Sequence, residues 1–428
     1  MKLIKLQLIL IPIFLSACVT IRTGERVEDY QDNIMQLTDR LNKNPDDYNA
    51  LRELSKILVR TNQNDQAQQF LAKAEMQNPN DPEILFYTGL NFEFLDNKKS
   101  ALEYYKKFNE VPLLSNYKKL MEGRYLWLSR EMVYQDIQIR LTQEKELESE
   151  RISPNSIAVF PLNYQGDDDS FAPLSRGLSE MISIDLGKVK QLTILERIRI
   201  QALKDELALG QTPIIDPTSA PRMGKLLGAS RILSGSFNVY DKERLFINLG
   251  SWDVQSSQTK EWINKDGNLD AFFQIEKELV INYLERIGIE LTPEERADIQ
   301  LIPTQNLEAF LSFCKGLEME DAGHYDRASS FFKAAANIDP NFETARTKSE
   351  SANSMSYGGG AKERITGVIP IDERIRPSER NLVNERLDAL SKGVRLNFIP
   401  GLDNRKPAQE KDIATALPDP PLPPKRPN

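Results

Sequence analysis

The stretch Gly224–Phe237, GKLLGASRILSGSF, places glycines among small and apolar residues and raises the possibility of a phosphate-binding loop. A phosphate loop runs strand, glycine turn, helix, so that the free amides at the start of the helix face the anion. Here a helical pattern comes first and a strand pattern follows. Gly228 is therefore predicted to cap the end of a helix, and Gly235 to mark a closely packed point in a strand.

Two further groups carry metal-binding or catalytic side chains. Asp167–Asp169 and Ser170 could contact calcium, but they lack the spaced ligands and distal glutamate of a calcium loop, so a solvated turn is favoured. His324 is the only histidine and lies between two helical patterns, which argues against structural zinc and against Ser-His-Asp catalysis. The sequence therefore predicts no metal, no cofactor and no enzyme activity.

The amino terminus has the pattern of a secretory signal. Lys2 and Lys5 precede an apolar run, Leu6–Leu15, which is too short to span a bilayer. The following Leu-Ser-Ala-Cys resembles a bacterial lipobox, which implies removal of residues 1–17 and lipidation of Cys18, with residues 18–29 as a tether. Three acyl chains would hold the protein stably on a membrane. Val19 stands where an inner-membrane retention signal carries Asp, so resemblance to enteric-type sorting favours a periplasm-facing outer-membrane anchor, although this rule depends on the host.

Composition excludes some classes of function. The formal net charge of −8 argues against nucleic-acid binding and against broad adhesion to anionic lipid. With Cys18 lipidated, only Cys314 remains, so no intrachain disulfide is expected.

Residues 30–148 contain a repeat. Leu51 and Leu85, and Ala67 and Ala101, are each separated by 34 residues. This period is typical of helix-turn-helix solenoids, and the two units resemble tetratricopeptide repeats. A preceding and a following helix are expected to complete the stack.

A separate copy lies in residues 291–350, which are predicted to form a helical linker and a single repeat. Gly316, Ala328 and Phe332 keep the repeat spacing, and this lone unit must pack its apolar face on the central domain or on the first repeats. Residues 351–428 are predicted to be a flexible, proline-rich region, with Ser349–Gly360 small and flexible.

Residues 155–290 alternate strand and helix patterns, which predicts an α/β domain. Its fragments IAVFPL, SRGLSEMISIDL, LERIRIQALKDEL and KLLGASRILSGSF resemble, in that order, the CsgG family of curli-secretion lipoproteins and the related TolB amino-terminal-like domains. The resemblance implies an anticodon-binding-like α/β sandwich engaged in envelope assembly at the outer membrane. Each subunit of the secretion channel contributes two additional amphipathic hairpins to a membrane barrel. In this chain the core elements are joined instead by a helix, by GQTPII and by a short turn at Tyr240–Glu243, so a pore is not expected.

Candidate interaction residues lie in two places. Glu196 and Arg197 sit between a strand and a helix; an intradomain ion pair that orients the helix is favoured over a subunit or partner contact. In the repeats, Tyr87, Phe92 and Tyr104 lie at helical spacing, and some of these aromatics are expected to line a peptide-accepting face while most form core.

The leading hypothesis is a non-enzymatic envelope lipoprotein that acts as a scaffold or as an assembly or secretion accessory factor. Its expected partners are envelope or secreted proteins and the membrane through its lipid, with homo-oligomers also considered. Two alternatives remain open: a subunit of a CsgG-like secretion channel, and a lipoprotein regulator of peptidoglycan synthesis.

Overall fold

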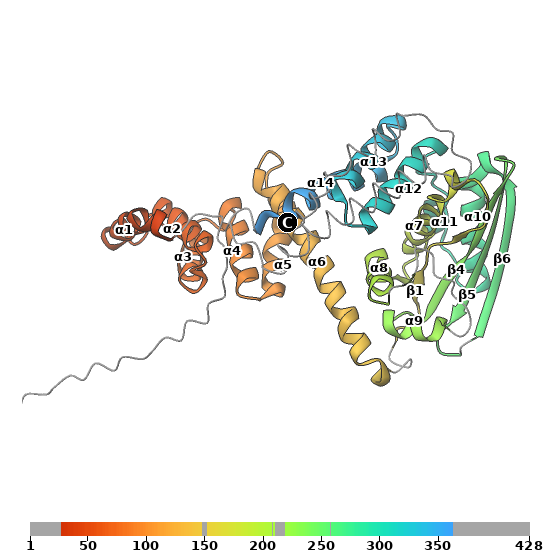
Figure 1. Ribbon diagram of the computed structural model, residues 1–428, viewed down its shortest axis with the longest axis horizontal. Coiled ribbons are helices and arrows are strands. Elements are labelled where there is room, and N and C mark those ends of the chain that lie inside the picture. The colour runs from red at the N-terminus through yellow and green to blue at the C-terminus, as the bar shows by residue number, and fades with distance from the viewer. Residues whose placement is uncertain (1–26, 148–151, 208, 210–218, 257, 363–428) are drawn as a thin grey trace, which may run out of the picture. The chain divides into compact units, whose positions relative to one another are not determined.

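The computed structural model describes residues 27–147, 152–207, 209, 219–256 and 258–362. The predicted signal, Cys18 and most of the proline-rich region lie outside these residues. The compact unit Ile34–Lys362 contains nearly all of the described fold. Figure 1 shows helices at both ends of this unit and one mixed sheet between them in sequence.

The amino-terminal part is helical, as the 34-residue period predicts. Asp47 and Asp81 begin α2 (Tyr48–Arg60) and α4 (Pro82–Phe94) by accepting hydrogen bonds from backbone amides of the first turn. Within the second unit, Gly89 of α4 lies so close to the Tyr105 ring of α5 (Lys98–Lys106) that any larger side chain there would collide with it. The elements are α1 Val27–Lys43, α2 Tyr48–Arg60, α3 Asn64–Gln77, α4 Pro82–Phe94, α5 Lys98–Lys106, η1 Lys107–Glu110, α6 Asn116–Thr142 and η2 Glu144–Glu146. We call α2–α5 the N-terminal repeats.

The central part is an α/β domain with a six-stranded sheet. Strands β3, β1 and β4 are parallel, β5 and β6 continue the sheet antiparallel, and β2 pairs with β4. The elements are β1 Ser156–Val159, β2 Asn163–Tyr164, η4 Asp169–Phe171, α7 Leu174–Gly187, β3 Thr193–Ile194, α8 Arg197–Glu206, α9 Ala220–Leu227, β4 Arg231–Tyr240, β5 Arg244–Asp253, β6 Gln258–Asn268, η5 Leu269–Ala271 and α10 Phe272–Arg286.

Strand alternation divides the side chains of this sheet between two cores. Leu233, Phe237 and Ile247 face α7 and α10, whereas Ala158 and Ile232 face α8 and α9. The sheet therefore has helices on both faces, consistent with the predicted α/β class.

The glycine-rich stretch has the structure that its residue order predicts. Gly228 adopts a left-handed conformation, φ 77°, at the end of α9. A Cβ on Gly235 would lie 1.9 Å from the carbonyl oxygen of Asn248 on β5. Three residues connect β4 to β5, and two of them, Asp241 and Lys242, have positive φ. The amide of Glu243 donates to the carbonyl of Tyr240, 3.0 Å away, and closes the turn.

The carboxy-terminal part is also helical, with α11 Pro293–Ile299, α12 Leu307–Asp321, α13 Tyr325–Ile338 and α14 Glu343–Gly359. We call α12–α13 the C-terminal repeat. The expectation of a flexible segment from Ser349 is wrong as far as Gly359, because these small residues allow α14 to pack closely. A Cβ on Gly123 of α6 would lie 2.7 Å from the Cα of Gly358.

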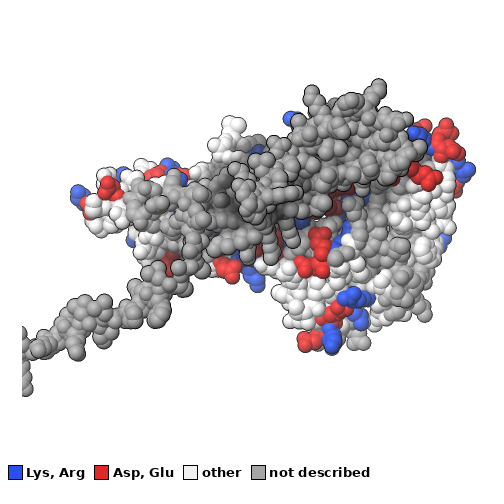
Figure 2. Space-filling model, in the orientation of Figure 1, with Lys and Arg blue, Asp and Glu red and all other residues white. Residues whose placement is uncertain are grey.

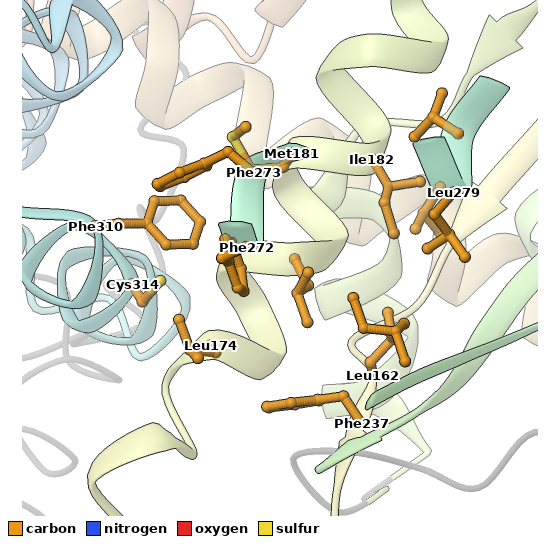
Figure 3. Close-up of a cluster of buried hydrophobic side chains, with 14 of the residues drawn as sticks. Leu162, Leu174, Met181, Ile182, Phe237, Phe272, Phe273, Leu279, Phe310 and Cys314 are labelled. Carbon is orange, nitrogen blue, oxygen red and sulfur yellow. The ribbon is translucent and has the colours of Figure 1, made fainter. Parts of the chain in front are cut away.

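The C-terminal repeat packs on the α/β domain. Helix α12 lies beside α7 in Figure 1, and in Figure 3 Phe310 and Cys314 point toward Phe272, Phe273 and Leu174. The buried apolar side chains of the repeat and of the domain belong to one continuous cluster. Among the described residues, no helix combines the length and apolar character needed to cross a membrane.

Candidate interaction site

A cavity of about 400 Å³ lies where the α/β domain meets the helices around it. Helices α6, α7, α12, α13 and α14 contribute to its wall, together with the connection from β3 to α8. We call it the junction cavity. Its lining is Leu126, Ser129, Arg130, Glu180, Ser183, Ile184, Ile194, Leu195, Glu196, Arg197, Ile198, Glu320, Asp321, Tyr325, Lys348 and Met355.

Arg197 is the centre of an ion-pair network in this wall. Its Nε lies 3.1 Å from a carboxylate oxygen of Glu180 on α7, and its two terminal nitrogens bond Glu320 and Asp321 at the end of α12. Arg197 thus joins α8 to α7 within the domain, and it also joins the domain to the C-terminal repeat.

Two more cations support the same carboxylates. Arg176 Nε lies 3.0 Å from Asp321, and Lys348 Nζ on α14 lies 3.0 Å from Glu320. Burial alone would favour the neutral acid at Glu320, but Lys348 and Arg197 outweigh it and hold the pKa of this carboxyl below its usual value. Glu320 therefore stays ionised and keeps three elements together.

The apolar part of the cavity wall carries a buried tyrosine. The Tyr325 hydroxyl has no hydrogen-bond partner among the described residues, and its ring packs edge-on against Trp127 of α6. Burial raises the pKa of Tyr325, so the hydroxyl remains protonated at neutral pH. The wall offers cations, carboxylates and apolar side chains, but no nucleophile activated by a base.

The structure separates the predicted interaction residues. Arg197 serves intrachain contacts, as the ion-pair interpretation expects, while Glu196 is exposed at the rim of the junction cavity. Tyr87 is 7% exposed and packs on Phe86, so it belongs to the core of the N-terminal repeats.

Phe92 and Tyr104 form a second, separate surface feature. Both are half-buried, and their ring centroids are 5.5 Å apart on α4 and α5. Lys107 lies over the Tyr104 ring, and Tyr104 donates a hydrogen bond to Glu75. Burial first, and then this hydrogen bond, raise the pKa of Tyr104 to about 12. We call Phe92 and Tyr104 the aromatic pair.

Sequence reasoning missed the partners that hold the helical parts together. Arg124 of α6 is 2% exposed, bonds Glu93 of α4, and donates to the carbonyl of Gly359, 2.7 Å away, at the end of α14. For the ion-pair network around Arg197, the only hint in the sequence was the acidic run Glu318–Asp321. Nothing in the spacing of that run indicates Arg197 as the partner.

No metal site emerges from the described part of the chain, where no group of three or more His, Cys, Asp and Glu side chains could hold an ion. Asp168 begins a short helical turn and pairs with Lys242 at 3.1 Å. On the described surface in Figure 2, acidic and basic side chains are interspersed.

Comparisons with known proteins identify two regions. Residues 142–245 match the family model described as "Curli production assembly/transport component CsgG", and residues 23–112 match the model described as "TT21 fifth ARM repeats domain". The chain therefore contains a CsgG-like domain preceded by helical repeats.

Among solved structures, the chain is similar to the LpoB C-terminal domain from Salmonella enterica at 14% identity, covering 31% of this chain and 94% of that one, with a TM-score of 0.24. A TM-score this low carries no structural inference. A search of curated proteins finds no match.

Proposed function

We propose that this chain, which carries a CsgG-like domain, is a non-enzymatic envelope lipoprotein that holds partner proteins at the outer membrane. The match of residues 142–245 to a family of curli assembly and transport components supports a role in envelope assembly. Helical repeats around such a domain support protein binding, since solenoids provide extended binding surfaces.

The observation that carries this proposal is the continuity of the helices. Helices α4, α5 and α6 pack in sequence order, α14 packs on α6, α13 on α14, α12 on α13, and α12 on α7 of the CsgG-like domain. The domain is thus inserted into a helical stack whose two halves meet through α6 and α14. A partner held on the N-terminal repeats would therefore be coupled through packed helices to the domain.

The aromatic pair is the proposed contact for a partner. Aromatic side chains are enriched among the residues that contribute most to protein interfaces, because they bury much area at low cost in side-chain entropy. Phe92 has an exposed part beside the Tyr104 ring, and Lys107 and Glu75 supply a charged rim. Tyr87 is not part of this proposed contact because its side chain is buried in the core of the N-terminal repeats.

Anchoring through lipid on Cys18 completes the proposal. The tether would place the scaffold at the membrane, and Cys18 precedes the first described helix, α1, in the sequence. Mass spectrometry of the protein purified from membranes tests this part. A mature amino terminus at Cys18 carrying acyl chains is expected, and an unmodified Cys18 would refute anchoring.

Affinity capture from envelope extract tests the scaffold. The wild-type chain is expected to retain specific proteins, and Phe92→Ser is expected to lose at least one of them by about tenfold or more, equivalent to a single interface hot spot. Tyr240→Ser is the matched control, because Tyr240 is also an exposed aromatic, 54% accessible, but lies on the hairpin between β4 and β5. Equal recovery with Phe92→Ser and wild type would count against the aromatic pair, and recovery of nothing specific would count against the scaffold.

A further inference from the structure

Two consecutive leucines lie exposed in the turn that leads into α6. Leu113 is 85% exposed and Leu114 is 98% exposed. Isolated exposed leucines are common in soluble proteins, but two adjacent ones, almost fully accessible, present a compact apolar tip. Nothing in the proposed scaffold function uses this tip.

The tip is held in place by its own turn. Val111 is buried and its amide donates to Phe108, while the amide of Ser115 donates to Pro112, 3.0 Å away. The Ser115 hydroxyl then accepts from the amide of Tyr117 and begins α6. The leucines are therefore presented by anchored backbone on both sides.

The segment that carries the tip is basic in a chain that is acidic overall. Residues 106–119 contain four lysines and one glutamate, Glu110, whereas the whole chain has a formal net charge of −8. Lys118 reaches back to the carbonyl of Val111, 3.4 Å away, so its ammonium lies at the base of the tip. The lysines are Lys106, Lys107, Lys118 and Lys119. Lys107 Nζ lies 3.5 Å from Glu75 and Lys119 donates to Asn353, 2.9 Å away, so Lys106 and Lys118 are the two that the tip can use.

We propose that this tip, Leu113 and Leu114 with Lys106 and Lys118, inserts into the surface of an anionic lipid bilayer. Apolar side chains flanked by lysines suit the boundary between acyl chains and headgroup phosphates, because each part then meets its complementary layer. A groove on a protein would accommodate the leucines but gives no reason for lysines on both flanks. The acidic remainder of the chain restricts the contact to this one loop.

Vesicle co-sedimentation tests the proposal with the chain from residue 19 onward, which lacks the lipidation site and keeps every described residue. Vesicles of equal parts phosphatidylglycerol and phosphatidylcholine are expected to bind it, and vesicles of phosphatidylcholine alone to bind it about tenfold less. Leu113→Ser with Leu114→Ser is expected to reduce binding to the anionic vesicles by about tenfold or more. Because both side chains are exposed, these substitutions leave the fold unchanged.

Matched controls separate the tip from general adhesion. Leu301→Ser removes another leucine that is 65% exposed and should leave binding unchanged. Lys106→Gln with Lys118→Gln should weaken binding about tenfold, whereas Lys315→Gln with Lys333→Gln, on the C-terminal repeat, should not. Equal binding by the double-serine variant and wild type, or no binding of wild type to anionic vesicles, would overturn the proposal. Neither result depends on the partner proteins of the proposed scaffold.

Discussion

The N-terminal repeats and the C-terminal repeat use the same spacing for different environments. Gly89 packs against Tyr105 and Gly316 packs against Phe332, and each pair has the same separation in sequence. The Tyr105 hydroxyl donates to Glu93, whereas Phe332 packs on Phe313 with ring centroids 5.3 Å apart. One position therefore supports a polar network in the first case and an aromatic core in the second.

The difference shows what a repeat pattern specifies. The glycine and the ring opposite it fix how two helices of one unit approach each other. Whether the ring carries a hydroxyl depends on its surroundings. Around Tyr105 these are Glu93 of the same unit and its partner Arg124 on α6, and around Phe332 they are the apolar core shared with the CsgG-like domain. Four tests, with five substitutions, address this contrast in order of decreasing effect.

Arg124→Met should have the largest effect. It leaves the buried Glu93 with only the more distant ammonium of Lys362, 3.7 Å away, and removes a donor to the last carbonyls of α14, so the free energy of unfolding should fall by about 3 kcal/mol or more. Urea denaturation measures this. Arg222→Met is the control, since Arg222 pairs with Glu144 at the surface and should contribute about 1 kcal/mol or less. Similar losses from both substitutions would refute a special role for Arg124.

Gly123→Ala tests the junction of α6 with α14 without changing charge. The added methyl would lie 2.0 Å from the carbonyl oxygen of Ser354, so α14 must shift, and a loss of about 2–3 kcal/mol is expected. Limited proteolysis should then cut within α14. Gly187→Ala, where a Cβ meets nothing within 4 Å, should leave both stability and cleavage unchanged.

Exchanging the two rings tests the contrast directly. Phe332→Tyr places a hydroxyl in an aromatic core and should cost about 2 kcal/mol, while Tyr105→Phe removes one hydrogen bond to Glu93 and should cost about 1 kcal/mol. Thermal unfolding of both variants provides the measurement. If Phe332→Tyr were the milder change, the two environments would not differ as described.

Glu276→Gln tests whether the C-terminal repeat unfolds with the domain. Burial, and next the charge of Asp185, raise the pKa of Glu276, so the folded chain holds this proton to higher pH than the unfolded chain does. Above about pH 4.3, stability should therefore fall as pH rises toward the raised pKa, because the unfolded state binds fewer protons.

In the glutamine variant, the free energy of unfolding should not fall with pH in this way. The variant should therefore be more stable than the wild type at pH 8 by about 1 kcal/mol. Hydrogen exchange of the wild type should show this pH dependence of the opening free energy in α12 as well as in α10, because their cores are continuous. The amides of α2 and α3 should not show it. An equal pH dependence in α2 and α3 would show that the two repeat regions do not unfold separately.

Local features were predictable from the sequence, and long-range partners were not. Residue types alone place Gly228 at a helix end and Gly235 in a strand, because each requirement is met by neighbours in sequence or by an adjacent strand. The contact of Gly123 with Gly358 joins positions more than two hundred residues apart, and no period connects them. The small residues of α14 therefore looked like a flexible segment.

The candidate site shows the same limit. The pair Glu196-Arg197 could be singled out, but the partners of Arg197, Glu320 and Asp321, lie on the C-terminal repeat, and the acidic run that contains them does not indicate which cation they bind. The aromatic spacing in α4 and α5 predicted Phe92 and Tyr104 together, yet it could not separate them from Tyr87, whose burial depends on Phe86 beside it.

Photocrosslinking in intact cells tests the central claim most directly. A photoreactive phenylalanine analogue in place of Phe92 is expected to trap the same envelope protein in repeated experiments. The analogue in place of Leu301, an exposed position in the connection between α11 and α12, is expected not to trap it. No adduct at Phe92, or the same adducts at both positions, would contradict a scaffold that binds its partner through the N-terminal repeats.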